Sequence, residues 1–430
     1  MDHKLISPRH VSNRLVVVFR TLVEAVVQVL ATDPDARILC TGPSDSSADT
    51  FAERLVAVGL EGHVASPRLT KEKLVRVNSP QRLGGMSAVR TDLLPYCPMV
   101  DGRFVIPDAQ TLAQCDIVVS TCAGAGLLHT ALVNDMGVDG FTDQREHKGS
   151  GCHFTHIFVD EASQAMEPES LVALALGGAS TSIVMAGDHK QLGVSVRSLA
   201  ATALELSLME RLISRPLYQS QLSQRRDPSF LADPSCAGLC VVKLLNNYRS
   251  HQAILEISSE LFYDGELRAC ANPVETDSLC TWEELAGPTD LYDLKGAEED
   301  LVEAEAPCPV MFFGIQGIEM HETDSPSWFN PVEGSKIVDL IEALLQSGSV
   351  DVDVRDIGVI AFYRQQVLKI RMMLRERNLG AVRVGGVHDY QGQEARIIFI
   401  STVVAKHRAF DAVSTLVHHP PPQLDFYGRF

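Results

Sequence analysis

The stretch FTHIFVDEASQAMEPES, from Phe154 to Ser170, decides how the chain folds. A short apolar run, His156–Val159, leads directly into two adjacent carboxylates, Asp160 and Glu161. Burying an acid pair at the end of a strand costs free energy unless a cation or a substrate interacts with it there. The stretch therefore predicts a buried strand that presents two acids at a site of chemistry.

Short apolar strands and helical patterns alternate around this stretch. Almost continuously apolar strands separated by helices indicate a parallel sheet covered by helices on both faces, so we expect the α/β class. Ligands bind such sheets beyond the carboxyl ends of the strands. The expected strands are Ala36–Gly42, Asp116–Thr121, His156–Asp160 and Ser182–Asp188, and the expected helices are Thr21–Leu30, Ser47–Val58 and Glu167–Leu176.

A second block repeats this alternation, which predicts two domains. We expect a first domain over residues 1–217, a linker over 218–240, a second domain over 241–405 and an irregular tail over 406–430. The second block has the expected strands Pro309–Ile315, Asp356–Tyr363, Ala381–Gly385 and Ala395–Thr402, and the expected helices Pro331–Leu345 and Gln365–Glu376.

Composition limits the possible classes of protein. The net charge of −18 excludes a generally basic nucleic-acid coat, although a local basic channel stays possible. Much of the excess lies in residues 264–307, where 13 acidic residues predict an exposed acidic insertion. The ten cysteines form no CxxC pair, which indicates reduced thiols and a cytoplasmic protein. The apolar run Leu15–Ala31 is broken by a polar stripe, so we expect no membrane partner.

The acid pair belongs to a DExxQ pattern that suits nucleoside triphosphate hydrolysis. Asp160 is the candidate ligand of Mg²⁺, and Glu161 is the candidate that orients or deprotonates the attacking water. The stretch AGDHKQLG, Ala186–Gly193, adds Gln191, whose neutral amide suits a contact with both the γ-phosphate of ATP and that water. The alternative is an ordinary helix start, because the helix dipole also favours acids there.

Two further stretches lie in the second block. LLNNYRSHQAI, Leu244–Ile254, places Arg249 just before a helix. An arginine supplied by another domain can stabilise charge on the transferred phosphoryl group. The stretch Val387–Thr402 places Gly392 and Glu394 in a loop before a strand.

The order and spacing of these motifs resemble those of superfamily 1 helicases, the group that includes the nonsense-decay RNA helicase, and above all the silencing-associated Armitage type. The resemblance covers about Leu22 to Val404, and the acidic insertion fits it poorly. It rests on the stretches PSDSSAD (Pro43–Asp49), STCAGAG (Ser120–Gly126), VDEASQAMEPES (Val159–Ser170), GDHKQLG (Gly187–Gly193), NYRSH (Asn247–His251), IGVIAFYRQQ (Ile357–Gln366) and YQGQE (Tyr390–Glu394).

The resemblance implies two RecA-like domains, the second incomplete, with ATP and Mg²⁺ between them and single-stranded RNA across their tops. It implies that Gln191 and Arg249 meet the γ-phosphate, that Gly392 and Glu394 border the nucleotide, and that Glu394 lies near the ribose. It also implies silencing or RNA-decay proteins as partners. The implied RNA-side residues are Pro43, Ser44, Ser46 and Thr121, with Ser401 and Thr402 from the second domain; as an alternative, the hydroxyls of this set cap helices.

Two family features are missing from the sequence. The phosphate loop G-x-x-x-x-G-K-[ST] should precede the first helix, but SNRLVVVFR (Ser12–Arg20) stands there, with Val18 and Phe19 at its final two positions. Lys4 and Arg20 are cations without the supporting turn. Near the other end, Arg408 lacks the neighbours of the family's last arginine motif. We therefore expect weak or absent ATP hydrolysis by this chain.

Several functions stay open at this point. The leading hypothesis is an ATP-dependent RNA helicase, and the second is a catalytically inactive RNA-binding or scaffold module, or a truncated fragment, of the same lineage. A DNA helicase is a third, because the choice of RNA depends on contacts with 2′-hydroxyls. An α/β protein without nucleotide chemistry is the least favoured, since seven motifs occur in order.

Overall fold

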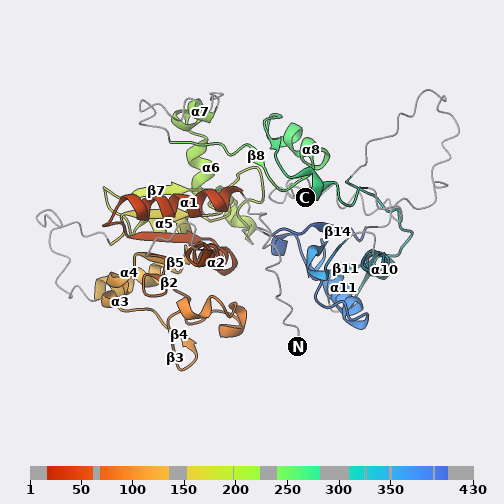
Figure 1. Ribbon diagram of the computed structural model, residues 1–430, viewed down its shortest axis with the longest axis horizontal. Coiled ribbons are helices and arrows are strands. Elements are labelled where there is room, and N and C mark those ends of the chain that lie inside the picture. The colour runs from red at the N-terminus through yellow and green to blue at the C-terminus, as the bar shows by residue number, and fades with distance from the viewer. Residues whose placement is uncertain are drawn as a thin grey trace, which may run out of the picture. The chain divides into compact units, whose positions relative to one another are not determined.

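The computed structural model divides the chain into two compact units (Figure 1). Among the described residues, those up to Leu244 form the first unit and those from Leu245 onward form the second. Each unit is described here by itself. The structure describes residues 17–61, 68–134, 153–196, 198–222, 240–280, 309–323, 325, 327–347, 351–390 and 393–404.

The first unit is built on a parallel sheet of five strands in the order β2-β5-β1-β6-β7. Its register aligns Thr41 of β1 with Ser120 of β5 and Val159 of β6, so these strands reach their carboxyl ends together. The strands are β1 (Ile38–Gly42), β2 (Leu74–Arg76), β5 (Ile117–Thr121), β6 (His156–Val159) and β7 (Ser182–Met185).

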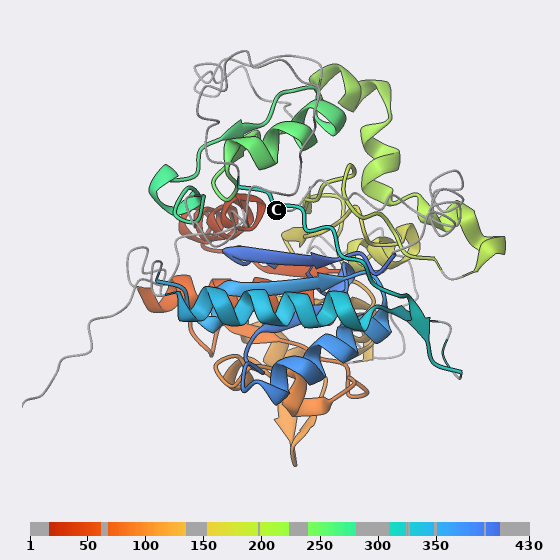
Figure 2. The same cartoon turned by 90° about the vertical axis from the view of Figure 1, so that its right-hand side faces the viewer.

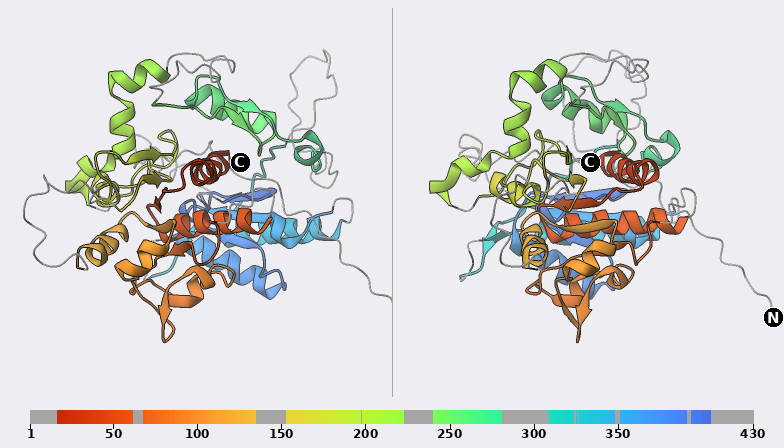
Figure 3. Two further views of the ribbon diagram at one scale, coloured as in Figure 1. Left: turned by 60° about the vertical axis from the view of Figure 1, so that its left-hand side comes forward. Right: turned by 90° about the vertical axis from the view of Figure 1, so that its left-hand side faces the viewer.

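Helices cover both faces of this sheet. Along β1, Ile38 and Cys40 pack with α1 and α2, whereas Leu39 points to the opposite face and packs with α3, α4 and α5. The sheet and its helices can be followed in Figures 1 and 3. Fully burying one such large apolar side chain contributes about 1.5–3 kcal/mol. These helices are α1 (Val17–Thr32), α2 (Asp45–Glu61), α3 (Ala109–Gln114), α4 (Ala125–Asn134) and α5 (Glu167–Leu174).

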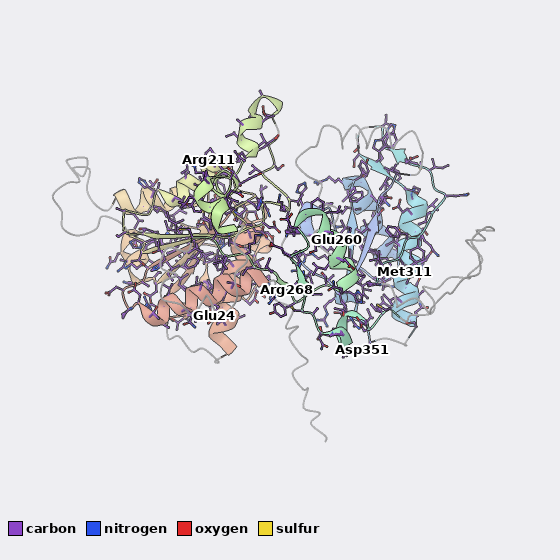
Figure 4. All side chains as sticks on the ribbon, turned by 90° about the horizontal axis from the view of Figure 1, so that it is seen from above. Glu24, Arg211, Glu260, Arg268, Met311 and Asp351 are labelled. Carbon is purple, nitrogen blue, oxygen red and sulfur yellow. The ribbon has the colours of Figure 1, made fainter. Side chains whose placement is uncertain are left out.

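The polar stripe expected on the first helix is confirmed for Glu24 and Gln28, which are exposed and joined by a hydrogen bond of 2.7 Å. Figure 4 labels Glu24 on this helix. No helix in the described part of the chain is long and apolar enough to cross a membrane. The smaller elements of the first unit are β3 (Met99–Val100), β4 (Arg103–Phe104), α6 (Leu208–Ile213), α7 (Pro216–Leu222) and the 3₁₀ helices η1 (Gly85–Ala88), η2 (Leu94–Tyr96) and η3 (Leu199–Glu205).

The second unit has a parallel sheet of three strands in the order β13-β12-β14. Apolar side chains of α10 and α11 pack against one face of this sheet (Figure 2). Its main elements are α10 (Pro331–Gln346), β12 (Ile357–Ala361), α11 (Arg364–Glu376), β13 (Arg383–Gly385) and β14 (Ile397–Ser401). Its smaller elements are β8 (Asn246–Asn247), α8 (Gln252–Phe262), β9 (Arg268–Ala269), α9 (Pro273–Thr276), β10 (Met320–His321), β11 (Trp328–Phe329), η7 (Val354–Asp356) and η8 (His388–Tyr390).

The structure confirms the α/β class and seven of the eight expected strands, but Pro309–Ile315 forms no strand. Phe312 in this segment is 94% exposed, and the labelled Met311 is exposed too (Figure 4). A β-branched and aromatic sequence forms a strand only where a neighbouring strand pairs with it. No described strand pairs with this segment, which explains the error.

Regular elements also occur at the start of two other segments. Helix α7 ends at Leu222, so the start of the segment expected as a linker is helical. The start of the segment predicted as an exposed acidic insertion contains β9 and α9, whereas residues 281–307 lie outside the described part of the chain.

A tyrosine joins two strands of the second sheet. The Tyr390 hydroxyl accepts a hydrogen bond from the Val359 N–H at 2.9 Å and donates one to the Arg383 carbonyl at 2.6 Å. Gly358 makes room for this hydroxyl, because a Cβ added there would lie 2.5 Å from its oxygen and 2.9 Å from Cδ1 of Ile398. Burial raises the pKa of Tyr390, which keeps the phenol protonated and able to donate.

We therefore expect Gly358→Ala to destabilise the second unit by about 1–3 kcal/mol, the usual cost of overpacking a core. Gly314→Ala is the matched control, because nothing lies within 4 Å of the Cβ it would add. Urea unfolding of both variants would measure the difference. Equal midpoints for the two variants would contradict the tight contact between Gly358 and Tyr390.

Candidate nucleotide and nucleic-acid site

The acid pair lies at the carboxyl end of β6, as expected. The Asp160 N–H donates to the Thr41 carbonyl at 2.8 Å, and Asp160 as a whole is 1% exposed. Glu161 has a φ of +49°, a left-handed conformation that costs a residue other than glycine about 1–3 kcal/mol. Such strain is concentrated at functional sites. The Gln164 amide fixes the Glu161 carboxylate with a hydrogen bond of 2.6 Å.

A second loop lies against the acid pair. The Ala162 N–H donates to the Ala186 carbonyl at 2.8 Å, which joins the segments that follow β6 and β7. Gly187 permits this approach, since a Cβ there would lie 3.0 Å from the backbone nitrogens of Ala162 and Ser163. In the same loop, the Gln191 amide donates to Asp188 at 2.6 Å. The structure thus brings the segments of the two predicted catalytic motifs to adjacent strand ends.

In the second unit, the NYRSH motif forms a turn before α8. The Asn247 side-chain oxygen accepts the N–H groups of Arg249 and Ser250 at 2.9 and 2.8 Å. His251 then caps α8 by accepting the Ala253 N–H through Nδ1 at 3.1 Å. These hydrogen bonds account for the spacing of Asn247 and His251 around Arg249. Both side chains bind backbone N–H groups and so fix the main chain before and after the arginine.

The turn holds Arg249 beside Glu394, the residue expected near the ribose. Nε of Arg249 lies 2.9 Å from Oε2 of Glu394, and about a quarter of each side chain is exposed. Two candidate nucleotide residues that are 145 positions apart are therefore direct partners. Gly392, the other candidate in this loop, lies outside the described residues.

The expected RNA-side residues of the first unit gather at the ends of β1 and β5. Gly42 is paired with Thr121 in the sheet, and Pro43 and Ser44 follow directly. Ser44 and Ser46 are exposed. Ser44 Oγ also accepts the Ser47 N–H at 3.1 Å, and Thr121 Oγ1 accepts the Gly124 N–H at 2.9 Å, so two of these hydroxyls do cap the turns that follow them.

The two candidates of the second unit differ. Ser401 is fully buried and its hydroxyl accepts the Gln366 amide at 2.9 Å, which argues against the RNA contact expected of this side chain. Thr402 is exposed, so the RNA contact expected of its side chain stays a prediction. Its backbone is held by Glu333, a buried carboxylate that accepts the N–H groups of Thr402 and Val403 at 2.7 and 2.9 Å.

Sequence reasoning missed Glu333 and its neighbour Asn330. Asn330 caps α10 through a hydrogen bond from the Glu333 N–H at 3.2 Å and donates to the Val403 carbonyl at 3.4 Å. The pattern Asn-Pro-x-Glu at a helix start was visible as a capping signal. Its hydrogen bonds to the end of β14 were not, because the partners lie about 70 residues away.

No three His, Cys, Asp or Glu side chains of the described residues gather as a ready-made metal site. Mg²⁺ binds proteins through one or two carboxylates together with phosphate oxygens and water. Asp160, a nearly buried carboxylate at a strand end, fits that role. Helix α1 begins at Val17, so Val18 and Phe19 occupy a first helical turn without the lysine and hydroxyl of a phosphate loop.

One titrating group lies in the loop after β7. Burial lowers the pKa of His189 from its ordinary 6.5, Lys190 acts in the same direction, and Asp188 opposes both. The unfolded chain therefore binds a proton that the folded chain resists, so the unfolding free energy falls as pH drops through about 6.5 towards the lower folded pKa.

We expect His189→Gln to weaken this pH dependence. Urea unfolding of the wild type and the variant at about pH 7.5 and about pH 5.5 would show a larger loss of stability for the wild type, since only it must take up the proton. An identical loss in both proteins would assign the pH dependence to other groups, such as His153, whose pKa is also lowered by burial.

Two family models match the chain, each described as an AAA domain, over residues 104–198 and 205–417. The chain is 39% identical over 394 residues to the RNA helicase Mov10l1 of Homo sapiens, with 91% of this chain and 28% of that protein covered. It is 36% identical over 399 residues to the putative helicase mov-10-B.1 of Danio rerio, with 89% and 34% covered.

The probable RNA helicase armi of Drosophila melanogaster is 32% identical over 407 residues, with 89% of this chain and 30% of that protein covered. The chain thus spans about a third of the length of these curated relatives. These matches confirm the resemblance carried by the motifs. The chain belongs to the superfamily 1 helicases, in the group that includes the RNA helicases Mov10l1 and Armitage.

Proposed function

We propose that this chain is the motor part of an ATP-dependent RNA helicase, which binds single-stranded RNA and Mg²⁺-ATP and remodels RNA or RNA–protein complexes. One observation carries the proposal. The hydrogen bond from Ala162 to Ala186 joins the segment of the acid pair to the segment of Asp188 and Gln191 at one edge of the first sheet. Nucleotide hydrolysis needs a metal ligand, a base and a phosphate-sensing amide in such proximity.

Asp160 would hold Mg²⁺ through its carboxylate, and the metal would neutralise charge on the phosphates. Glu161 would accept a proton from the attacking water, while Gln164 keeps its carboxylate oriented. Gln191 would orient that water through its side-chain amide. Arg249 of the second unit would stabilise charge on the transferred phosphoryl group.

Nucleotide affinity of this chain should be low. The phosphate loop of the family normally supplies a lysine and several backbone N–H groups, and Val18 and Phe19 stand where its final two residues should be. Each charge-assisted hydrogen bond contributes about 1.5–3 kcal/mol. Losing two such bonds weakens binding at least about 100-fold, because about 1.4 kcal/mol corresponds to a factor of ten.

The residues proposed to contact RNA are Pro43, Ser44, Ser46 and Thr121 in the first unit and Thr402 in the second. Exposed hydroxyls and backbone amides at strand ends suit contacts with phosphate and ribose. The relatives are described as RNA helicases, which favours RNA over DNA as the substrate. The cytoplasmic location and the silencing or decay partners expected from the sequence stay predictions.

A second function is favoured by the missing phosphate loop. A chain that keeps the RNA-side residues but binds nucleotide poorly would act as an RNA-binding scaffold. The two functions share the RNA contacts and differ in whether RNA stimulates turnover of ATP.

The deciding measurement is RNA-stimulated ATP hydrolysis by the purified chain, with Glu161→Gln as the matched control. Glutamine keeps the size of the side chain and a hydrogen-bonding group for Gln164, but it cannot take a proton. We expect slow hydrolysis that rises with RNA and falls by about 10²–10⁴-fold in the variant, the usual contribution of a general base.

The other outcomes separate the alternatives. RNA binding without hydrolysis above the control would assign the scaffold function. Equal stimulation by single-stranded DNA would contradict the choice of RNA. Absence of both RNA binding and hydrolysis would overturn the proposed function for this chain.

A further inference from the structure

Arg76, the last residue of β2, is the largest fully buried side chain among the described residues. Its guanidinium donates from Nε to Asp49 at 2.9 Å and from Nη2 to Asp45 at 3.0 Å. Nη1 donates to the Val77 carbonyl at 2.5 Å. An arginine without access to water needs such partners, because a buried charge is costly unless it is paired.

A second arginine completes the group. Arg82 donates from Nη1 and Nη2 to the two carboxylate oxygens of Asp49, at 3.0 and 2.6 Å. It also donates to the Asn78 side chain at 2.6 Å, and its Nε lies 3.9 Å from Asp45. Two arginines thus face two aspartates, so the group, here called the arginine clamp (Asp45, Asp49, Arg76 and Arg82), carries no net charge.

The location of the clamp connects it to the RNA side. Asp45 is the first residue of α2, and Asp49 lies one turn further along the same helix. The exposed Ser44 and Ser46 flank Asp45 directly. The clamp therefore fixes the first two turns of α2 to the end of β2, at the carboxyl edge of the sheet.

The clamp also neutralises the negative charge of Asp45, which lies beside the proposed RNA contacts. The Asp45 side chain is 41% exposed at the start of α2, where a bare carboxylate would repel the phosphates of a nucleic acid. Arg76 and Arg82 neutralise it from the inside of the protein, where burial keeps them away from phosphate themselves; the Arg76 side chain is 0% exposed and that of Arg82 is 6% exposed.

We propose that the arginine clamp is a positioning unit for RNA, which holds Pro43 to Ser46, the end of the loop after β1 and the start of α2, in the orientation that meets the phosphate backbone. The four side chains act through this segment and do not touch the RNA. The inference rests on the proposed function, because it assigns the clamp to the RNA contacts of that same site.

The critical variant is Asp45→Ala, because two explanations predict opposite changes in RNA affinity. If the clamp positions the loop, removing Asp45 releases the first turn of α2 from Arg76 and RNA affinity falls, by about tenfold for one charge-assisted hydrogen bond. If only the local charge matters, removing a carboxylate beside a polyanion raises RNA affinity. Asp92→Ala is the matched control, since Asp92 is also an exposed first-unit aspartate paired with an arginine, at 2.6 Å.

The salt dependence of RNA binding gives the second readout. If Arg82 bound phosphate directly, Arg82→Gln would make the plot of log K against log salt less steep by about 0.7. A positioning role leaves this slope unchanged while the RNA affinity falls. Arg76→Lys keeps the charge but replaces the three separate guanidinium nitrogens, which reach Asp49, Asp45 and the Val77 carbonyl, with a single ammonium nitrogen. We therefore expect it to reduce RNA affinity as Asp45→Ala does, again with an unchanged slope.

Hydrogen exchange separates this inference from the proposed function, because it needs no RNA. Asp45→Ala should speed amide exchange in the first turns of α2, over residues 47–52, and Asp92→Ala should not. Unchanged exchange in residues 47–52, or an RNA affinity that rises in Asp45→Ala, would contradict the positioning role of the clamp. Faster exchange in a chain whose wild type binds no RNA would instead reject the proposed function and the RNA role of the clamp, and leave only a structural contact.

Discussion

The parallel register of the first sheet is the constraint on which the candidate site depends. Backbone hydrogen bonds from Asp160 to Thr41 and from Ala186 to Val159, both 2.8 Å, end three strands at one edge. These backbone hydrogen bonds bring residues that are far apart in sequence to the same edge of the sheet. The strain at Glu161 is tolerated because strands packed on both faces hold the backbone on either side of it.

The two units position their candidate residues in different ways. In the first, Asp160 and Glu161 follow a strand directly, and their positions are set by the sheet itself. In the second, Arg249 and Glu394 are placed by a turn and a loop, and each is the partner of the other. A ligand of the second pair must therefore compete with an ion pair, whereas the first pair is arranged by backbone contacts before any ligand arrives.

Sequence reasoning succeeded where a residue's role follows from local order. Periodicity and apolar runs located β1, β5, β6 and β7 of the first sheet and all three strands of the second, but not the short strand β2. The acid pair follows its strand as expected, and the roles of Gln191 and Arg249 stay predictions. Sequence reasoning failed for Pro309–Ile315, because strand formation requires a partner that local sequence does not reveal. It also failed for Arg76, since nothing in LVRV indicates that its charge is buried against two aspartates from another helix. The burial of Ser401 was hidden for the same reason, because Gln366 comes from α11.

The open side of β7 has a consequence for the behaviour of the chain in solution. This strand, Ser182–Met185, is the last in the described sheet, has no charged side chain, and leaves Ile183 49% exposed. Main-chain donors and acceptors on such an edge are a template for another strand, and proteins usually guard them with lysine, proline or a bulge. Edge-to-edge association at high concentration is therefore expected to begin at β7, and Ile183→Lys is a single change that would discourage it.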